Sequence, residues 1–152
     1  MRRIRPARLE EAEALSSLCK RSKAHWGYDD VFMAQARPSL TVGVAQIEAG
    51  NVWVAEVGDA LAGMVALAPL SEPGLVDLDK LFIDPAHIGS GVGRTLLNAA
   101  INEARRRGYR RMAILADPNA AKFYERMSAR YLDERSSDAI PGRLLPYFEL
   151  TL

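Results

Sequence analysis

Apolar residues recur at helical spacing in one long segment of this chain and alternate with polar residues in several short ones. The clearest helix is predicted over residues 91–107, where six apolar residues share one face: Val92, Leu96, Leu97, Ala100, Ile101 and Ala104. Arginines 105–107 follow at the negative end of the helix dipole, and Gly108 suits the position just after the helix. This segment is therefore expected to pack as an amphipathic helix on a core.

The shorter segments complete the order β-α-α-β-β-β-α-β-α-β-β. Further helices are predicted over residues 6–24, 31–37 and about 117–127. Strands are predicted around Ile4 and over residues 51–57, 61–70, 75–84, 112–116, 131–134 and 145–152. Strands alternate with helices in the middle of the chain and follow one another at the ends, which predicts an α/β protein with a mixed sheet.

Composition and charge narrow the classes of protein to consider. The 152 residues predict one domain over residues 1–152, and the net charge of +1 gives no electrostatic reason to expect nucleic acid. Cys19 is the only cysteine and there are two histidines, so neither an internal disulfide nor a metal site is expected. The basic N-terminus precedes no apolar run, and no run could span a bilayer, which predicts a cytoplasmic protein without membrane contact.

Three alternating glycines, Gly89, Gly91 and Gly93, stand where a predicted strand leads into the long helix, which they open. Glycine lets the backbone approach a ligand closely, and a helix N-terminus offers free N–H groups and a positive dipole end. The segment therefore predicts a phosphate or pyrophosphate site. A dinucleotide-binding G-x-G-x-x-G does not fit, because Arg94 or Leu96 stands at the third glycine, and the spacer of a P-loop is absent. A tight turn without a ligand is the alternative.

The segment 88–93, Ile-Gly-Ser-Gly-Val-Gly, resembles the Gln/Arg-x-x-Gly-x-Gly/Ala signature of the GNAT acetyltransferases. Residues 116–127 resemble a second motif of that family, with the matching order and separation. Three positions depart from the family pattern, where Gln or Arg, Asn and Gly are usual: Ile88, Asp117 and Ser128. The resemblance implies a mixed, mostly antiparallel sheet of about six to seven strands flanked by about four helices.

The same resemblance implies acetyl-CoA as the cofactor and a set of residues that bind it. Pantetheine is expected along the strand before the glycines, pyrophosphate on the backbone N–H groups of the loop, including that of Ile88, and further contacts downstream. The implied cofactor residues are Leu81, Phe82, Ile83, Ile88, Gly89, Ser90, Gly91, Val92, Gly93, Arg94, Asn119, Ala120 and Phe123.

Acetyl transfer to an amine needs a base for the amine and an acid for the leaving thiolate. Tyr124 matches the family's general acid, since a phenol with a pKa of about 10 keeps its proton at pH 7. A core tyrosine is the alternative. Asp77 falls on the position of the catalytic carboxylate in histone-type members, and its spacing from Asp79 predicts a shared strand face with Leu81 and Ile83.

Other interpretations of these residues stay open. Asp77 is alternatively a solvated or ion-paired strand residue, and Glu56 and His25 are rival bases. In the family, the region after the first helix forms the acceptor wall, which makes His25, Trp26 and Tyr28 candidate substrate residues. The alternative there is a helix break in which the tryptophan fills the core.

The acceptor and the partners follow less directly from the sequence. Arg143 is either a ligand for an acceptor carboxylate or a plain surface arginine. We expect N-acetylation of a small amine, with protein N-acetylation or a non-catalytic acyl-CoA sensor as alternatives, and the family resemblance suggests a homodimer.

Overall fold

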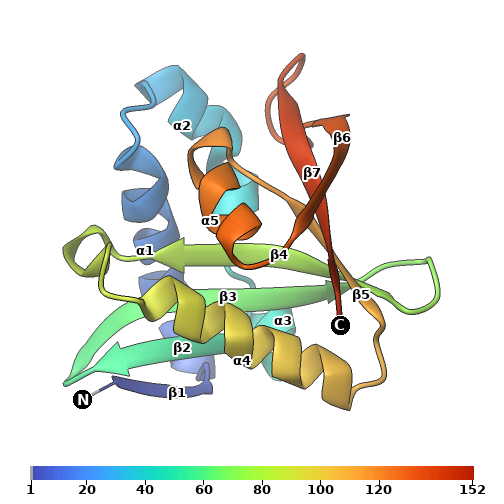
Figure 1. Cartoon of the computed structure of the whole chain (residues 1–152). Coiled ribbons are helices and arrows are strands. Elements are labelled where there is room, and N and C mark those ends of the chain that lie inside the picture. Colours follow the sequence, from blue (N-terminus) through green and yellow to red (C-terminus); the bar gives the residue numbers. More distant parts are fainter. Residues whose placement is uncertain (1) are drawn as a thin grey trace.

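The computed structural model describes residues 2–152, which form a seven-stranded mixed sheet with helices on both faces (Figure 1). The strands are β1 (Arg2–Pro6), β2 (Val52–Val57), β3 (Ala60–Pro69), β4 (Leu75–Ile83), β5 (Arg111–Leu115), β6 (Arg130–Ser136) and β7 (Leu144–Thr151). The α-helices are α1 (Ala12–Ala24), α2 (Asp30–Ala36), α3 (Val44–Glu48), α4 (Val92–Arg106) and α5 (Ala121–Arg126). The predicted fold class, α/β with a mostly antiparallel sheet, is confirmed.

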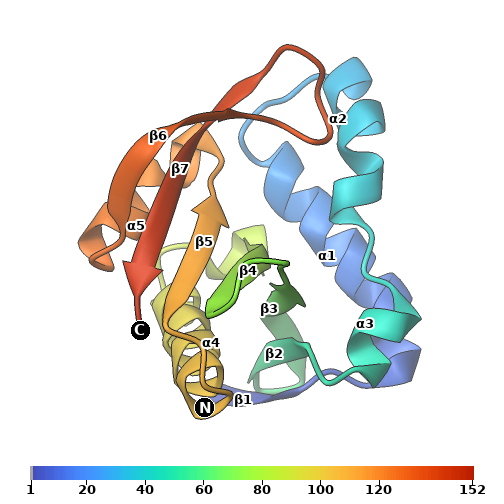
Figure 2. The same cartoon turned by 90° about the vertical axis from the view of Figure 1, so that its right-hand side faces the viewer.

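The strand order is β1-β2-β3-β4-β5-β7-β6, and among the described residues only the β4–β5 pair is parallel. Helix α4 packs on one face with a core of buried residues from β3, β4, β5 and β7. Helices α1, α2 and α3 cover the other face, where α1 buries Leu15, Leu18 and Cys19 against β2 and β3 (Figure 2).

Two differences from the predicted elements lie in the first third of the chain. Helix α1 begins at Ala12 rather than at residue 6, because β1 continues to Pro6 and Ala7 still donates to the Val52 carbonyl at 2.9 Å. Helix α3 was not predicted. It has five residues, of which Ile47 is the buried one, and so short a segment carries no readable period.

Strands β4 and β5 diverge, and this opens the sheet near its centre. Nine residues make up β4, but only Leu75, Val76 and Asp77 pair with β5. From Leu78 onward, the edge of β4 that faces β5 has no strand partner within residues 2–152. Backbone N–H and C=O groups on this edge are available to a ligand.

A β-bulge in β4 lies beside the opening. Leu78 pairs with Leu67 of β3 and Lys80 with Ala66, so Asp79 is the extra residue. The insertion reverses the alternation of side chains along the strand. Leu78 and Leu81 therefore both pack on the α4 face, although they are three positions apart.

Gly63 of β3 permits the close approach of β4 and α4. A Cβ atom there would lie 2.9 Å from the Ile83 and Leu96 Cδ1 atoms and 3.0 Å from the Phe82 carbonyl oxygen. We expect Gly63→Ala to lower the free energy of unfolding by about 1–3 kcal/mol, as overpacked cores do, in urea-unfolding measurements. Gly43→Ala is the matched control, since a Cβ at Gly43 meets nothing within 4 Å. Equal stability of the two variants would contradict this packing argument.

Candidate active site

The divergence of β4 and β5 opens into a cavity of about 640 Å³. Its walls come from β4 and the ends of β5 and α1, from α2, from the start of α4, from α5, and from the loop between β6 and β7. Twelve of the thirteen predicted cofactor residues line it, and Ser90 does not. Both predicted catalytic residues, Asp77 and Tyr124, line the same cavity, as do Trp26 and Arg143.

The glycine loop has the backbone geometry of an anion site. Gly89 and Gly91 adopt φ angles of +82° and +85°, in the left-handed region that favours glycine, and Gly91 caps α4. The first N–H groups of a helix lack partners within it, and here they adjoin the cavity. The Ile88 N–H donates to the Pro85 carbonyl at 3.4 Å, so the expectation that this group is free for a phosphate needs correction.

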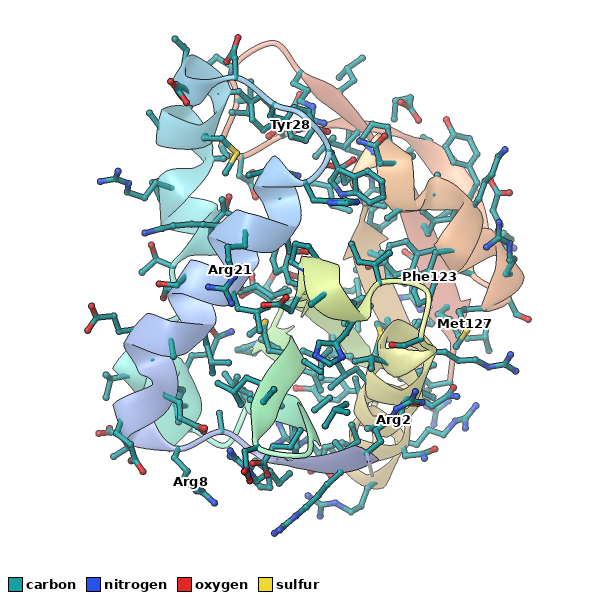
Figure 3. All side chains as sticks on the ribbon, turned by 90° about the vertical axis from the view of Figure 1, so that its left-hand side faces the viewer. Arg2, Arg8, Arg21, Tyr28, Phe123 and Met127 are labelled. Atoms are coloured by element: carbon teal, nitrogen blue, oxygen red, sulfur yellow. The ribbon has the colours of Figure 1, made fainter. Side chains whose placement is uncertain are left out.

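Arg2 contacts the same loop and was missed by sequence reasoning. Its guanidinium donates to Thr95 Oγ1 at 3.0 Å and to the Ser90 carbonyl, and Figure 3 shows it near the start of α4. Ser90 donates its hydroxyl to the His87 carbonyl, so its side chain is bound inside the loop rather than facing the cavity. Eighty-eight positions separate Arg2 from Ser90, and no local sequence signal marks their contact.

Asp77 is a partly buried carboxyl group whose pKa is raised. Burial, followed by the charges of Asp79 and Asp138, raises its pKa to about 6. Its side chain has no hydrogen bond or ion pair to any residue in the range 2–152, whereas Asp79 pairs with Lys80 at 2.7 Å. The alternative of an ion-paired Asp77 therefore finds no support in this structure.

The expected shared face of Asp77 with Leu81 and Ile83 is wrong. Cross-strand neighbours place Leu81 and Ile83 on the α4 face, while Asp77 lies with Lys80 and Phe82 on the opposite face, toward α1 and α2. The bulge at Asp79 is the physical reason, because one inserted residue exchanges the faces beyond it.

Tyr124 is buried in α5 beside the cavity. Burial, with a smaller contribution from the charge of Asp117, raises its pKa above the usual value for a phenol. Its ring packs against Phe123 at 5.2 Å and Phe148 at 6.1 Å between centroids. Its hydroxyl has no hydrogen-bond partner among the described residues, although the residue lines the cavity. Tyr124 thus packs as a core tyrosine, and its raised pKa keeps the hydroxyl protonated at neutral pH.

A polar cluster joins α1, the segment after it and the segments after β5 and β6 at one end of the cavity. Asp117 accepts from Lys23 Nζ at 2.6 Å and from the Tyr28 hydroxyl at 2.8 Å. Arg143 Nη2 donates to the same Tyr28 hydroxyl at 2.7 Å and lies 3.7 Å from Asp117. Burial would raise the pKa of Asp117, but the bond and charge of Lys23 outweigh it and keep the pKa below its usual value.

Of the other candidate residues, Tyr28, His25 and Glu56 lie away from the cavity wall, and Trp26 lines it. Tyr28 stacks on Phe32 at 3.9 Å and does not line the cavity, although its hydrogen-bond partners Asp117 and Arg143 do. His25 packs against Trp26 outside the cavity lining, and Glu56 of β2 is bound by Arg5 at 2.7 Å. Neither of these rival bases therefore faces an acceptor in the cavity. Trp26, which is 45% exposed, lines the cavity rather than filling the core.

Metal sites, membrane-spanning helices and a reactive cysteine are all lacking from the part of the chain that the structure describes. No group of three or more His, Cys, Asp or Glu side chains in residues 2–152 is arranged to hold a metal ion. None of the helices described is long and apolar enough to cross a bilayer. Cys19 is buried in the α1 core away from the cavity, where burial raises the pKa of its thiol to about 12.

Comparison with known proteins matches residues 13–129 to the model of the acetyltransferase (GNAT) family. The chain is 33% identical over 64 residues to N-acetyltransferase 8F1 of Rattus norvegicus, covering 40% of this chain and 29% of the relative. It is 28% identical over 86 residues to N-acetyltransferase 8 of Homo sapiens, covering 54% and 38%. The matched segments span about a third of the length of these curated relatives.

Solved structures share the whole fold at low sequence identity. The PaiA N-acetyltransferase of Thermoplasma acidophilum, solved in complex with coenzyme A, superposes with a TM-score of 0.80 at 16% identity, covering 100% of this chain and 99% of that one. YncA of Salmonella typhimurium, a putative acetyltransferase solved with acetyl-CoA, gives 0.72 at 23% identity, covering 99% and 94%. At these identities the likeness concerns the fold.

Proposed function

Because the chain belongs to the acetyltransferase (GNAT) family, we propose that it is an acetyl-CoA-dependent N-acetyltransferase that acts on a small primary amine. The observation that carries the proposal is the convergence of three features on one cavity. These are the unpaired edge of β4, the glycine loop at the start of α4, and the two side chains Asp77 and Tyr124.

The donor set of the cavity fits coenzyme A. The loop offers backbone N–H groups and the positive end of a 15-residue helix to a pyrophosphate, with the Arg94 side chain at the same rim. The free edge of β4 from Leu78 to Ile83 offers an amide-bearing chain such as pantetheine the hydrogen bonds of a missing strand. A strand N–H on this edge also suits a thioester carbonyl, whose oxygen gains negative charge during transfer.

The proposed reaction is direct transfer. The amine nitrogen attacks the thioester carbonyl carbon, so that a C–N bond forms and the C–S bond breaks. Asp77 takes the proton that the amine releases, and Tyr124 gives its proton to the departing sulfur. The two side chains are suited to opposite tasks, because Asp77 is ionised at neutral pH and Tyr124 is not.

The decisive test is the release of CoA thiol from acetyl-CoA by the purified protein, followed with and without a panel of primary amines. Amine-dependent release with formation of the N-acetyl product supports the proposal. Tight CoA binding without release from any amine would favour the acyl-CoA sensor. The departures from the family pattern at Ile88, Asp117 and Ser128 support that alternative, and Ser128 holds a φ of +70° in place of the usual glycine.

Replacing Gly91 by Glu is expected to abolish CoA binding, because it adds a carboxylate at the proposed pyrophosphate site. The backbone φ of +85° also strains any side chain, and a Cβ would lie 3.5 Å from the Arg2 guanidinium. Isothermal titration with CoA measures the effect. Gly91→Ala carries the strain without the charge, and Gly108→Glu places the same side chain at φ +89° in open space at the far end of α4. Retained affinity in Gly91→Glu would show that the loop does not hold the cofactor.

A further inference from the structure

We infer that the acceptor is an amino carboxylic acid: a primary amine joined through an apolar chain to a carboxylate that Lys23 and Arg143 bind. The inference rests on the proposed function and specifies its acceptor. It comes from an imbalance of charge between two parts of the cavity wall.

The basic part is the cluster around Asp117. Lys23 and Arg143 share this single carboxylate, so the cluster carries one positive charge in excess. Both cations are largely buried, with side-chain exposures of 15% and 19%, and both line the cavity. A buried excess charge is unfavourable unless a partner neutralises it. An incoming carboxylate would complete the pairing.

Arg143 has the geometry for this role. Its guanidinium carbon lies over the rings of Phe32 and Tyr28, at 4.8 and 5.1 Å from the centroids, so cation–π contacts help to hold it there. Its hydrogen bond to Tyr28 and its ion pair to Asp117 both use Nη2. A guanidinium has five N–H donors in a rigid fork, so donors remain for a bidentate carboxylate. The arginine is therefore not the plain surface residue considered above.

The acidic part of the wall is centred on Asp77, the last residue of β4 that pairs with β5. Asp77 lines the cavity without an ion pair to any residue in the described part of the chain, and the charge of Asp138 on the same cavity wall helps to raise its pKa. A protonated amine bound beside Asp77 would offset this negative charge. The cavity wall also carries apolar side chains, among them Trp26, Leu40 and Ile140. This arrangement complements an ammonium, a hydrocarbon chain and a carboxylate.

The strand geometry indicates how far apart the two groups are. Asp77 pairs with Ala113 of β5, and Asp117 follows Ala113 by four residues in extended backbone. At about 3.3 Å per residue, these backbone positions lie roughly 13 Å apart along the sheet. Side chains reaching in from both ends leave room for an amine and a carboxylate separated by several bonds, which is more than an α-amino acid provides.

The experiment compares acceptors that differ only in the distal group. Initial rates of thiol release from acetyl-CoA are measured with 6-aminohexanoate, hexylamine and 1,6-diaminohexane, and with norleucine, the six-carbon α-amino acid. We expect kcat/KM for 6-aminohexanoate to exceed that for hexylamine at least about tenfold, as a charge-assisted hydrogen bond allows. The diamine should be the poorest acceptor. A kcat/KM for hexylamine or for the diamine equal to that for 6-aminohexanoate would overturn the inference. A higher kcat/KM for norleucine would overturn the proposed separation between amine and carboxylate.

A variant then tests whether the Arg143 side chain binds the carboxylate. Arg143→Gln should lower kcat/KM for 6-aminohexanoate about tenfold or more and for hexylamine far less, so that the ratio of the two falls. Arg143→Lys should restore part of the ratio. Arg135→Gln is the matched control, because Arg135 stacks on Tyr147 outside the cavity lining. A structural defect alone would lower both rates together and leave the ratio unchanged, which would refute the role of Arg143.

A binding measurement separates this inference from the proposed function. If no amine releases thiol, the catalytic proposal has failed, and calorimetry with the CoA-bound protein then tests the recognition of the acceptor directly. Tighter binding of 6-aminohexanoate than of hexylamine, lost in Arg143→Gln, would support the inference even without catalysis. Equal or undetectable binding of both would refute it.

Discussion

The Asp77→Asn variant is expected to acetylate amines with a kcat about 10²–10⁴-fold below that of the unchanged protein, because it lacks the proposed proton acceptor. The substitution keeps the shape of a side chain that has no bonding partner among residues 2–152, so the cavity should persist. Steady-state kinetics of thiol release measure the effect. Activity within a factor of about three would exclude Asp77 as the base.

The pH profile gives an independent check on this assignment. The base must be ionised to accept a proton, so kcat/KM should rise with pH through about 6 and level off above it. Asp79→Asn removes the neighbouring charge that helps to raise the pKa of Asp77, and should move this acidic limb to lower pH. A limb that stays in place in Asp79→Asn, or that survives in Asp77→Asn, would point to another group.

The contribution of Asp77 to the free energy of unfolding should fall as the pH rises, whereas the activity should increase. A pKa raised from 3.8 to about 6 corresponds to about 3 kcal/mol that favours protonated Asp77 in the folded state. That stabilisation is complete at pH values below 3.8 and is lost as the pH rises through about 6. Asparagine does not ionise, so Asp77→Asn should match the unchanged protein near pH 3.8 and be more stable by up to about 3 kcal/mol above pH 7.

Removal of one oxygen atom in Tyr124→Phe is expected to lower kcat by about 10²-fold or more with little change in CoA affinity. The raised pKa keeps the hydroxyl protonated across the working range, so the variant loses a donor rather than a charge. Its ring contacts with Phe123 and Phe148 are unaffected by the substitution. Single-turnover thiol release and CoA titration together measure the two quantities.

Tyr147→Phe is the control for this experiment, since Tyr147 is also a buried tyrosine, but it donates to Glu149 and does not line the cavity. Its kcat should stay near that of the unchanged protein. An equal loss in both variants would mean that the loss of any buried hydroxyl impairs the fold. An unchanged kcat in Tyr124→Phe would remove this residue from the mechanism.

The spacing of residues within one segment was enough to predict those parts of the site that lie on a single segment. The six-residue apolar stripe predicted α4, and the glycines before it predicted the loop, because both depend on spacing within a few residues. Phe123, which the second motif implies as a cofactor residue, lies beside that loop in the structure, where a Cβ on Gly93 would lie 3.5 Å from its ring.

Contacts between distant segments could not be predicted in this way. The bulge at Asp79 depends on how β4 pairs with β3, and a strand pattern alone gives no sign of it. The bonds from Arg2 to the loop and from Lys23 to Asp117 join residues about ninety positions apart. Each of these residues is an ordinary charged position in the sequence, and only the fold brings them together.

The extra residue in β4 makes this strand much more sensitive to changes of length than to changes of identity. Before Asp79, the odd-numbered Asp77 faces α1 and α2, whereas after it the odd-numbered Leu81 and Ile83 face α4. Deleting one residue there would turn the remaining strand over and direct Asp77 or Leu81 to the wrong layer of the protein. Related chains should therefore tolerate a change of side chain at this position better than a change in the number of residues between Asp77 and the glycine loop.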